Sequence, residues 1–130
     1  MGFQATHKFA RISPRKARLL MNLIRDRDVD DAISLLRFTK HRASRMIEKV
    51  VKTAVANAHE TPASRRQALF VAQAWVDPGP VIKRFQPKDR GKAYPIKKRT
   101  AHLVVTVDER EEGVAYEVKK SVGGRPGKAR

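Results

Sequence analysis

The stretch that decides the fold is Val81-Ile82-Lys83-Arg84-Phe85-Gln86-Pro87-Lys88-Asp89-Arg90-Gly91-Lys92-Ala93-Tyr94-Pro95-Ile96-Lys97-Lys98-Arg99-Thr100. Eight of its residues are Lys or Arg and one is Asp. Strand-like segments at residues 69–76 and 101–107 flank it, so the pattern predicts a β-hairpin that continues out of a sheet. Such a hairpin has no apolar face to pack against its own protein. It therefore requires a polyanion around it, and we expect a nucleic acid that encloses it.

The turn of this hairpin is expected at residues 88–92, where Asp89, Arg90 and Gly91 supply turn chemistry. Residues 77–80, Asp-Pro-Gly-Pro, are expected to bend the chain where the regular strand ends. The ten steps from residue 81 to residue 91 allow a reach of at most roughly 33 Å at ~3.3 Å per residue. Connections this long are usually functional or disordered, so the alternative is a solvated, flexible loop that happens to be basic.

The residues before the hairpin predict one strand and a first helix. A strand is expected at residues 3–12, and Ser13 and Pro14 then favour an N-cap and the first position of a helix that reaches about residue 25. Its predicted buried face is Ala17, Leu20, Met21 and Ile24, and its polar face is Arg15, Arg18, Asn22 and Arg25.

Two further helices are expected before the strand at residues 69–76. Asp30 and Asp31 favour a helix N-terminus, and Ala32, Leu35 and Leu36 give that second helix a short apolar stripe. Thr39 is expected to cap a third helix over residues 40–60. The apolar stripe of the third helix is Ala43, Met46, Ile47, Val50, Val51, Ala54 and Ala58.

Composition restricts the class of protein. The chain has 130 residues, 41% of them hydrophobic, which suits one domain with a modest core. The formal net charge of +16 favours nucleic acid or an anionic membrane surface as partner. Because no stretch of 18 apolar residues occurs, we expect no membrane span. The absence of cysteine excludes disulfides and thiolate metal sites, and the N-terminus lacks a signal-peptide pattern.

A second basic cluster lies at the expected start of the first helix, in Arg11-Ile12-Ser13-Pro14-Arg15-Lys16-Ala17-Arg18. The unpaired N–H groups of a helix N-terminus attract phosphate, and four basic residues beside one make an anion site. The alternative is an ordinary capped helix with a solvated polar face.

Nothing in the sequence predicts catalysis, a cofactor or a metal. None of the nucleophile-elbow, phosphate-loop or zinc-protease motifs occurs. The histidines, such as His59 and His102, have no ligand spacing and are expected to contact RNA or solvent. Trp75 lies in the regular strand and is expected to pack in the core or on a sheet face.

Several of these segments together carry a resemblance. The helix-start motif of residues 11–18, Ala54-Val55-Ala56-Asn57-Ala58, Asp77-Pro78-Gly79-Pro80 and Lys97-Lys98-Arg99-Thr100-Ala101-His102 stand in a specific order. In this order they resemble the bacterial large-subunit ribosomal protein L22 family over about residues 3–108. The resemblance implies an α+β fold, with three helices packed on a small three-stranded antiparallel sheet and one long protruding basic β-hairpin.

The resemblance also implies a function and partners. It implies a structural protein that binds large-subunit ribosomal RNA, aids subunit assembly and helps line the polypeptide exit tunnel with its hairpin. The implied RNA-binding residues are Arg11, Ser13, Arg15, Lys16, Arg18, Lys83, Arg84, Lys88, Arg90, Lys92, Lys97, Lys98, Arg99 and His102. The implied tunnel-facing tip is Lys83, Arg84, Lys88, Asp89, Arg90, Gly91 and Lys92.

The expected partners are the ribosomal RNA, neighbouring ribosomal proteins including L4, and the nascent polypeptide, with no homo-oligomer. We expect one domain at residues 1–108, with its hairpin at about 77–101, and a basic, flexible extension at residues 109–130. The expected location is the ribosome in the cytoplasm of a bacterium, or in an organelle that encodes the protein. The alternative function is a free-standing regulator that binds DNA or RNA with a helix-turn-helix formed by the first two helices.

Overall fold

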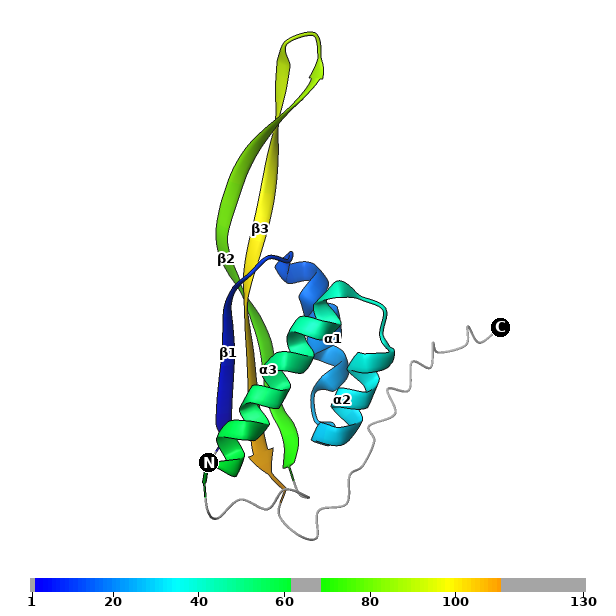
Figure 1. The fold of residues 1–130 in the computed structure, drawn as a ribbon, viewed down its shortest axis with the longest axis vertical. Helices are drawn as coiled ribbons and strands as arrows, with labels where there is room; N and C mark the ends of the chain where they lie inside the picture. The colour runs from blue at the N-terminus through cyan, green and yellow to red at the C-terminus, as the bar shows by residue number, and fades with distance from the viewer. Residues whose placement is uncertain (1, 62–68, 111–130) are drawn as a thin grey trace, which may run out of the picture.

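The fold is α+β, as the sequence predicts, and the computed structural model describes residues 2–61 and 69–110 (Figure 1). The described elements are, in chain order, β1 (Phe3–Ala10), α1 (Pro14–Ile24), α2 (Val29–Phe38), α3 (Arg42–His59), β2 (Leu69–Asp89) and β3 (Lys92–Glu109). The expected extension falls outside the described residues from residue 111 onward, so the domain boundary at residue 108 stays a prediction.

The three strands form an antiparallel sheet in the order β1-β3-β2, and the three helices cover one of its faces (Figure 1). Alternate residues of the central strand β3 supply the sheet side of the core because successive side chains of a strand point to opposite faces. These residues, which the alternation along residues 101–107 places on one face, are all buried: Ala101, Leu103, Val105 and Val107. The other face of the sheet has no helix over it among the described residues.

Helix α1 begins at Pro14 and buries Ala17, Leu20, Met21 and Ile24, all as predicted. It ends at Ile24, one residue earlier than expected. Strand β1 is two residues shorter than the prediction because the chain leaves the sheet after Ala10. The side chain of Ser13 forms no capping hydrogen bond, so proline at the first position carries the start of this helix.

The prediction for the start of α3 was wrong. Thr39 does not cap α3 but ends α2, because its N–H and its hydroxyl both donate to the carbonyl of Leu35. Helix α3 begins at Arg42, with His41 at the N-cap position. The apolar stripe of α3 is buried as predicted, except that Met46 is only partly buried.

The hairpin forms with the predicted turn, but β2 does not end at residues 77–80. It continues to Asp89, and the bend is a shift of register between Pro78 and Val81. Gly79 is required there because a Cβ at this residue would lie 2.5 Å from the Thr100 hydroxyl oxygen, which donates a hydrogen bond to the Pro80 carbonyl. At the turn, Gly91 has a φ of 85°, a conformation that favours glycine.

Candidate nucleic-acid interface

The outer part of the hairpin, residues 81–99, contributes nothing to the core. We call it the arm. None of its residues is buried, and only Ile96 reaches intermediate exposure. The eight steps from Val81 to Asp89 correspond to about 26 Å at ~3.3 Å per residue, and Figure 1 shows the arm projecting far beyond the helices. The sequence therefore predicted the missing apolar face correctly.

Pairing across the arm places like charges opposite each other. Lys83 is the direct partner of Lys97 in the β2–β3 register. Such pairs lie about 5 Å apart at Cβ and destabilise a hairpin when both carry the same charge. Among the described residues of the arm, Asp89 at the turn is the sole acid. The arm thus holds positive charge that only an external anion can neutralise.

The two aromatic residues of the arm lie on opposite faces. Phe85 pairs with Pro95, and Tyr94 pairs with Gln86, so the two rings occupy neighbouring rungs of the ladder. Neighbouring rungs of a ladder point to opposite faces. Phe85 is 75% exposed, while the hydroxyl of Tyr94 donates to a carboxylate oxygen of Asp89 at 3.2 Å. The arm therefore presents one ring on each face.

The basic cluster at the start of α1 lies beside the base of the arm. The guanidinium of Arg11 donates to the Arg99 carbonyl at 3.0 Å, so the start of α1 and the arm, which are far apart in the sequence, are in direct contact. Arg15 and Lys16 point into solvent. Ser13 is partly exposed at the N-cap of the same helix.

Arg18 and Arg25, which belong to the predicted polar face of α1, also form hydrogen bonds to the sheet. Arg18 donates to the Val76 carbonyl at 3.2 Å and Arg25 to the Ala74 carbonyl at 2.8 Å. Arg25 further donates to the side-chain oxygen of Asn22. The bonds to the Val76 and Ala74 carbonyls hold Arg18 and Arg25 against β2, so these two side chains have less freedom than a solvated face implies.

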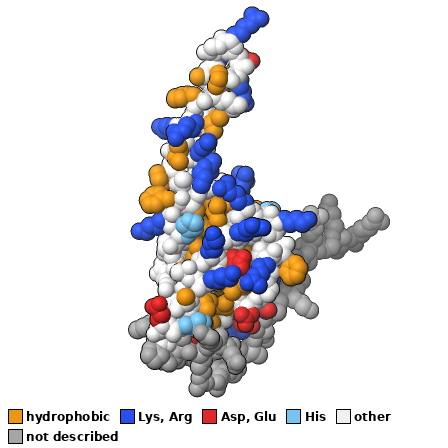
Figure 2. All heavy atoms as spheres, in the orientation of Figure 1, with side chains coloured by type: hydrophobic (Ala, Val, Ile, Leu, Met, Phe, Trp, Pro, Cys, Tyr) orange, Lys and Arg blue, Asp and Glu red, His pale blue; other side chains and the backbone are white. Residues whose placement is uncertain are grey.

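Charge is separated along the molecule. The N-termini of α1 and α3 lie at the end of the helical layer from which the arm projects (Figure 1), and neither has an acidic residue in its first turn. Helix α2 runs the other way and carries Asp30 and Asp31 in its first turn. Since a helix N-terminus is equivalent to about half a positive charge, two positive helix ends join the basic side chains near the arm. Figure 2 shows Lys and Arg along the arm and over the adjoining part of the domain.

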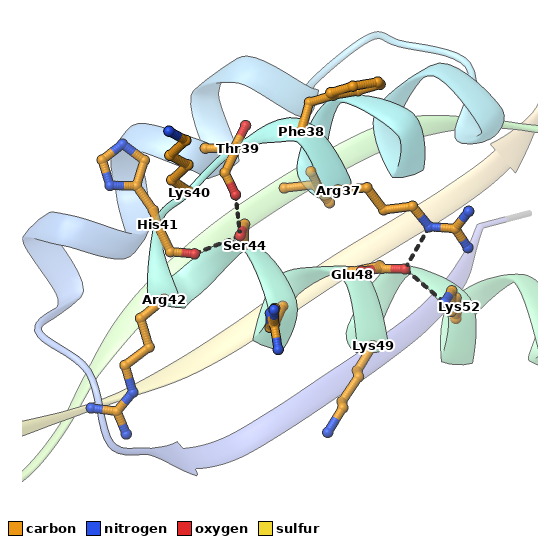
Figure 3. Close-up of a pocket in the computed structure, with 12 residues that line it drawn as sticks. Arg37, Phe38, Thr39, Lys40, His41, Arg42, Ser44, Glu48, Lys49 and Lys52 are labelled. Atoms are coloured by element: carbon orange, nitrogen blue, oxygen red, sulfur yellow. Dashed lines mark hydrogen bonds and ion pairs between the residues drawn. The ribbon is translucent and has the colours of Figure 1, made fainter.

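A basic groove lies between α2 and α3, and it was not predicted as a site from the sequence (Figure 3). It has a volume of about 860 Å³ and is lined by Phe38, which is 88% exposed, and by a set of basic residues. These residues are Arg37, Lys40, His41, Arg42, Arg45, Lys49 and Lys52. The signal was present in the sequence, because residues 42, 45, 49 and 52 recur at helical spacing on one side of α3.

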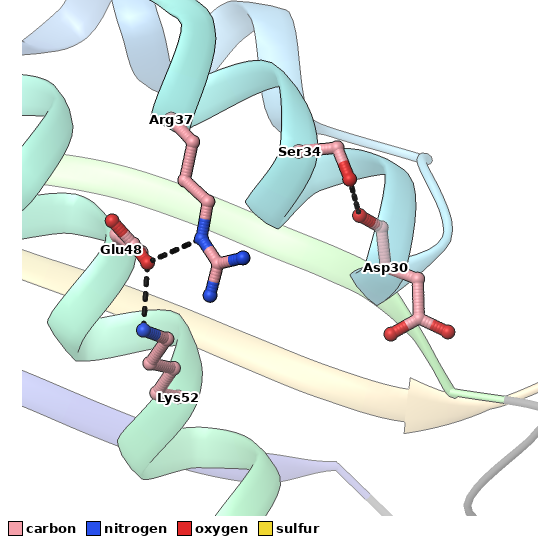
Figure 4. Close-up of polar contacts among 5 residues, drawn as sticks. All are labelled: Asp30, Ser34, Arg37, Glu48 and Lys52. Atoms are coloured by element: carbon pink, nitrogen blue, oxygen red, sulfur yellow. Dashed lines mark hydrogen bonds and ion pairs between the residues drawn. The ribbon is translucent and has the colours of Figure 1, made fainter.

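Glu48 is the one acidic residue that lines this groove, and it is already paired. Its carboxylate accepts hydrogen bonds from Lys52 at 2.7 Å and from Arg37 at 3.1 Å (Figures 3 and 4). The hydrogen bond from Lys52, and then that from Arg37, lowers the pKa of Glu48 below its usual value. Lys40, Arg42, Arg45 and Lys49 remain for an external anion.

The described residues argue against the alternative of a helix-turn-helix. In that motif the first residues of the second helix contact bases between phosphates. Here the second helix, α2, begins at Val29, carries Asp30 and Asp31 in its first turn and buries Ala32 and Leu36. Acidic residues at that position would repel the phosphates.

No group of three or more His, Cys, Asp or Glu side chains in residues 2–61 and 69–110 could hold a metal ion. Within the same ranges, no helix is both long and apolar enough to span a membrane.

Comparison with known proteins gives a consistent result. A family model described as "Ribosomal protein L22p/L17e" matches residues 5–108. A protein of Carboxydothermus hydrogenoformans is 44% identical over 113 residues, which is 87% of this chain and 100% of the relative. A protein of Lacticaseibacillus casei is 50% identical over 82% of this chain and 92% of the relative, and one of Thermoanaerobacter sp. is 46% identical over 85% and 100%. All three are named "Large ribosomal subunit protein uL22".

Proposed function

Because the chain belongs to the ribosomal protein L22p/L17e family, we propose that it binds large-subunit ribosomal RNA with its arm and with the basic end of its domain. The family consists of structural proteins of the large ribosomal subunit, so the chain is a structural ribosomal protein in the cytoplasm and not an enzyme. The observation that carries the RNA proposal is the arm itself. It projects about 26 Å without one buried residue and with lysines opposite each other.

The proposed mechanism is electrostatic and geometric. The core fixes the direction of the arm because β3 is both the central strand of the sheet and one half of the arm. Where RNA segments converge around the arm, its cations neutralise phosphates and release counterions. The start of α1 and the groove between α2 and α3 then contact RNA that passes the base of the arm. Protein bound in this way joins RNA segments and aids assembly of the subunit.

The turn of the arm is the part proposed to line the polypeptide exit tunnel, near ribosomal protein L4. Residues 88–92 lie farthest from the core, at the tip of a two-stranded ribbon that is narrow enough to pass between RNA segments. The chain has no cysteine, so Arg90→Cys creates a unique attachment point for a cross-linker. Ribosomes with a stalled nascent chain should yield a cross-link from position 90 and none from the control Asp30→Cys at the opposite end of the domain.

The RNA proposal is tested with an arm-shortened variant, in which Asn-Gly replaces residues 82–98. Val81 and Arg99 are direct partners, so a two-residue turn can close the shortened hairpin. Tagged wild-type protein should co-sediment with the large subunit in a high-salt sucrose gradient, and the variant should be released into the light fractions. Wild-type protein in the light fractions, or a variant retained as strongly as wild type, would refute the proposal.

A further inference from the structure

Strand β1 contains an irregularity between His7 and Ala10. His7 pairs with Leu103 and Ala10 pairs with Ala101, so three steps along β1 match two steps along β3. The extra residue makes a β-bulge at Lys8 and Phe9. Bulges redirect side chains and are frequent beside functional sites.

The bulge forces Phe9 into an unusual backbone conformation. Its φ is 58°, in the left-handed region that bulky L-residues rarely adopt and that glycine or asparagine occupies more easily. Backbone strain of this kind persists where the surrounding structure determines it, and it gathers at functional sites. The bulge also restores Ala10 to the buried face of the sheet, where it is 2% exposed.

Packing does not explain a phenylalanine at this position. Phe9 is 64% exposed, and it lies outside the cluster of buried and partly buried side chains that forms the core. A smaller residue that tolerates a positive φ would satisfy the fold better. The strained backbone and the exposed ring are two separate observations, and each indicates that the ring is there for a partner.

The position of the ring is fixed by His102. The N–H of Phe9 donates to Nδ1 of His102 at 3.1 Å. The two rings also meet edge to face, with centroids 5.1 Å apart and an interplanar angle of 85°. A contact of this kind involves at most one flat face of Phe9, so the other face is left for stacking.

The surroundings of the ring are cationic. Lys8 and Arg11 flank Phe9 in the sequence and are exposed, and Arg11 is held against Arg99 at the base of the arm. An exposed aromatic ring beside cations that can hold a phosphate backbone is the arrangement with which proteins bind unpaired nucleotides. A purely apolar partner would not need these charges.

We propose that Phe9, held by the bulge and by His102, is a stacking platform for one unpaired base of the ribosomal RNA. Lys8 and Arg11 contact the phosphates on either side of that base. This inference rests on the proposed RNA binding and adds a residue to it that acts by stacking and not by charge.

The test compares Phe9→Asn with Phe9→Trp in binding to a transcript of large-subunit ribosomal RNA. Asparagine tolerates the positive φ, so Phe9→Asn should have a melting temperature no lower than that of wild type. Asparagine has no aromatic ring, however, and cannot stack on a base as phenylalanine does. Its affinity should fall about 5- to 150-fold, the range that one base–aromatic stack contributes. Phe9→Trp should bind within about threefold of wild type because it keeps a flat ring.

Fluorescence gives a direct measure of stacking. Trp75 is the only tryptophan of the chain, so the difference between Phe9→Trp and wild type reports on position 9 alone. Stacking of a base on that indole should quench the difference signal when RNA binds. An unquenched signal, or a Phe9→Asn variant that binds as tightly as wild type, would overturn the inference while leaving the proposed function intact.

Wild-type protein that does not bind the transcript would refute the proposed function itself. A Phe9→Asn variant that melts lower than wild type would show that the ring serves stability, and would also overturn the inference.

Discussion

Shortening the arm should lower the affinity for RNA and leave the stability of the fold almost unchanged. The replacement of residues 82–98 by Asn-Gly removes seven Lys or Arg side chains and Asp89. None of the removed residues is buried, and Gly79 and Thr100, which pack together at the base, are kept. Surface changes of this kind alter the free energy of unfolding by about 0.5 kcal/mol or less. The melting temperature should therefore stay within about 3 °C of wild type.

The loss of RNA affinity can be worked out from the same residues. Each cation that neutralises a phosphate contributes about 0.7 to 0.9 to the slope of log affinity against log salt. If all seven removed cations contact phosphate, the slope should become shallower by about 5 to 6. Between 50 and 200 mM salt, a fourfold change, wild-type protein should then lose about 10³- to 10⁴-fold more affinity than the variant.

The assay is filter binding to a large-subunit RNA transcript at four or more salt concentrations, with melting followed by circular dichroism. A folded variant whose slope equals that of wild type would refute the electrostatic role of the arm. A melting temperature lowered by 10 °C or more would refute the separate claim that the arm contributes nothing to the core.

Three further changes test the groove and the base of the arm. Glu48→Gln should raise RNA affinity about threefold because it removes the repulsion between the carboxylate and an RNA phosphate. Two unit charges ~7 Å apart in water interact by about 0.6 kcal/mol. The pKa of Glu48 is lowered in the fold. The ionised carboxylate therefore stabilises the fold, by about 0.5 kcal/mol, at pH values above the usual pKa of a glutamate. The difference in melting temperature between wild type and Glu48→Gln should therefore disappear as the pH falls through the lowered pKa. Arg45→Gln should make the salt slope of RNA binding shallower by about 0.7 to 0.9, whereas the control Arg27→Gln, near the acidic end, should leave it unchanged. Gly79→Ala should lower the melting temperature by several degrees because its Cβ meets Thr100, and an unchanged value would contradict the close approach.

The regular parts of this fold could be predicted from local patterns. The apolar stripes of α1 and α3 and the alternation in β3 are periodic, and the structure buries them as expected. The turn at Gly91 and the exposure of the arm also follow from local chemistry, because glycine and charge act within a few residues.

Features that depend on distant partners could not be predicted in this way. Thr39 is a reasonable N-cap by residue type, and only the geometry of α2 shows that its hydroxyl is bonded to Leu35. Arg18 and Arg25 appear solvated in a helical projection, but carbonyls of β2, more than 45 residues away, accept their hydrogen bonds. The bulge at Phe9 likewise depends on the register with β3, which no local pattern reveals.

The direction of the helices lets one polyanion contact the arm, the start of α1 and the start of α3 together. Helices α1 and α3 start at the same end of the sheet, and that is the end from which β2 and β3 leave as the arm. Their uncapped N-termini, the cations beside them and the arm therefore face one region of space. The reversed helix α2 puts Asp30 and Asp31 at the other end, where a phosphate backbone would be repelled. If the protein binds RNA as proposed, this charge separation should orient it before any specific contact forms, so we expect the arm to approach RNA first and the acidic end to stay outside.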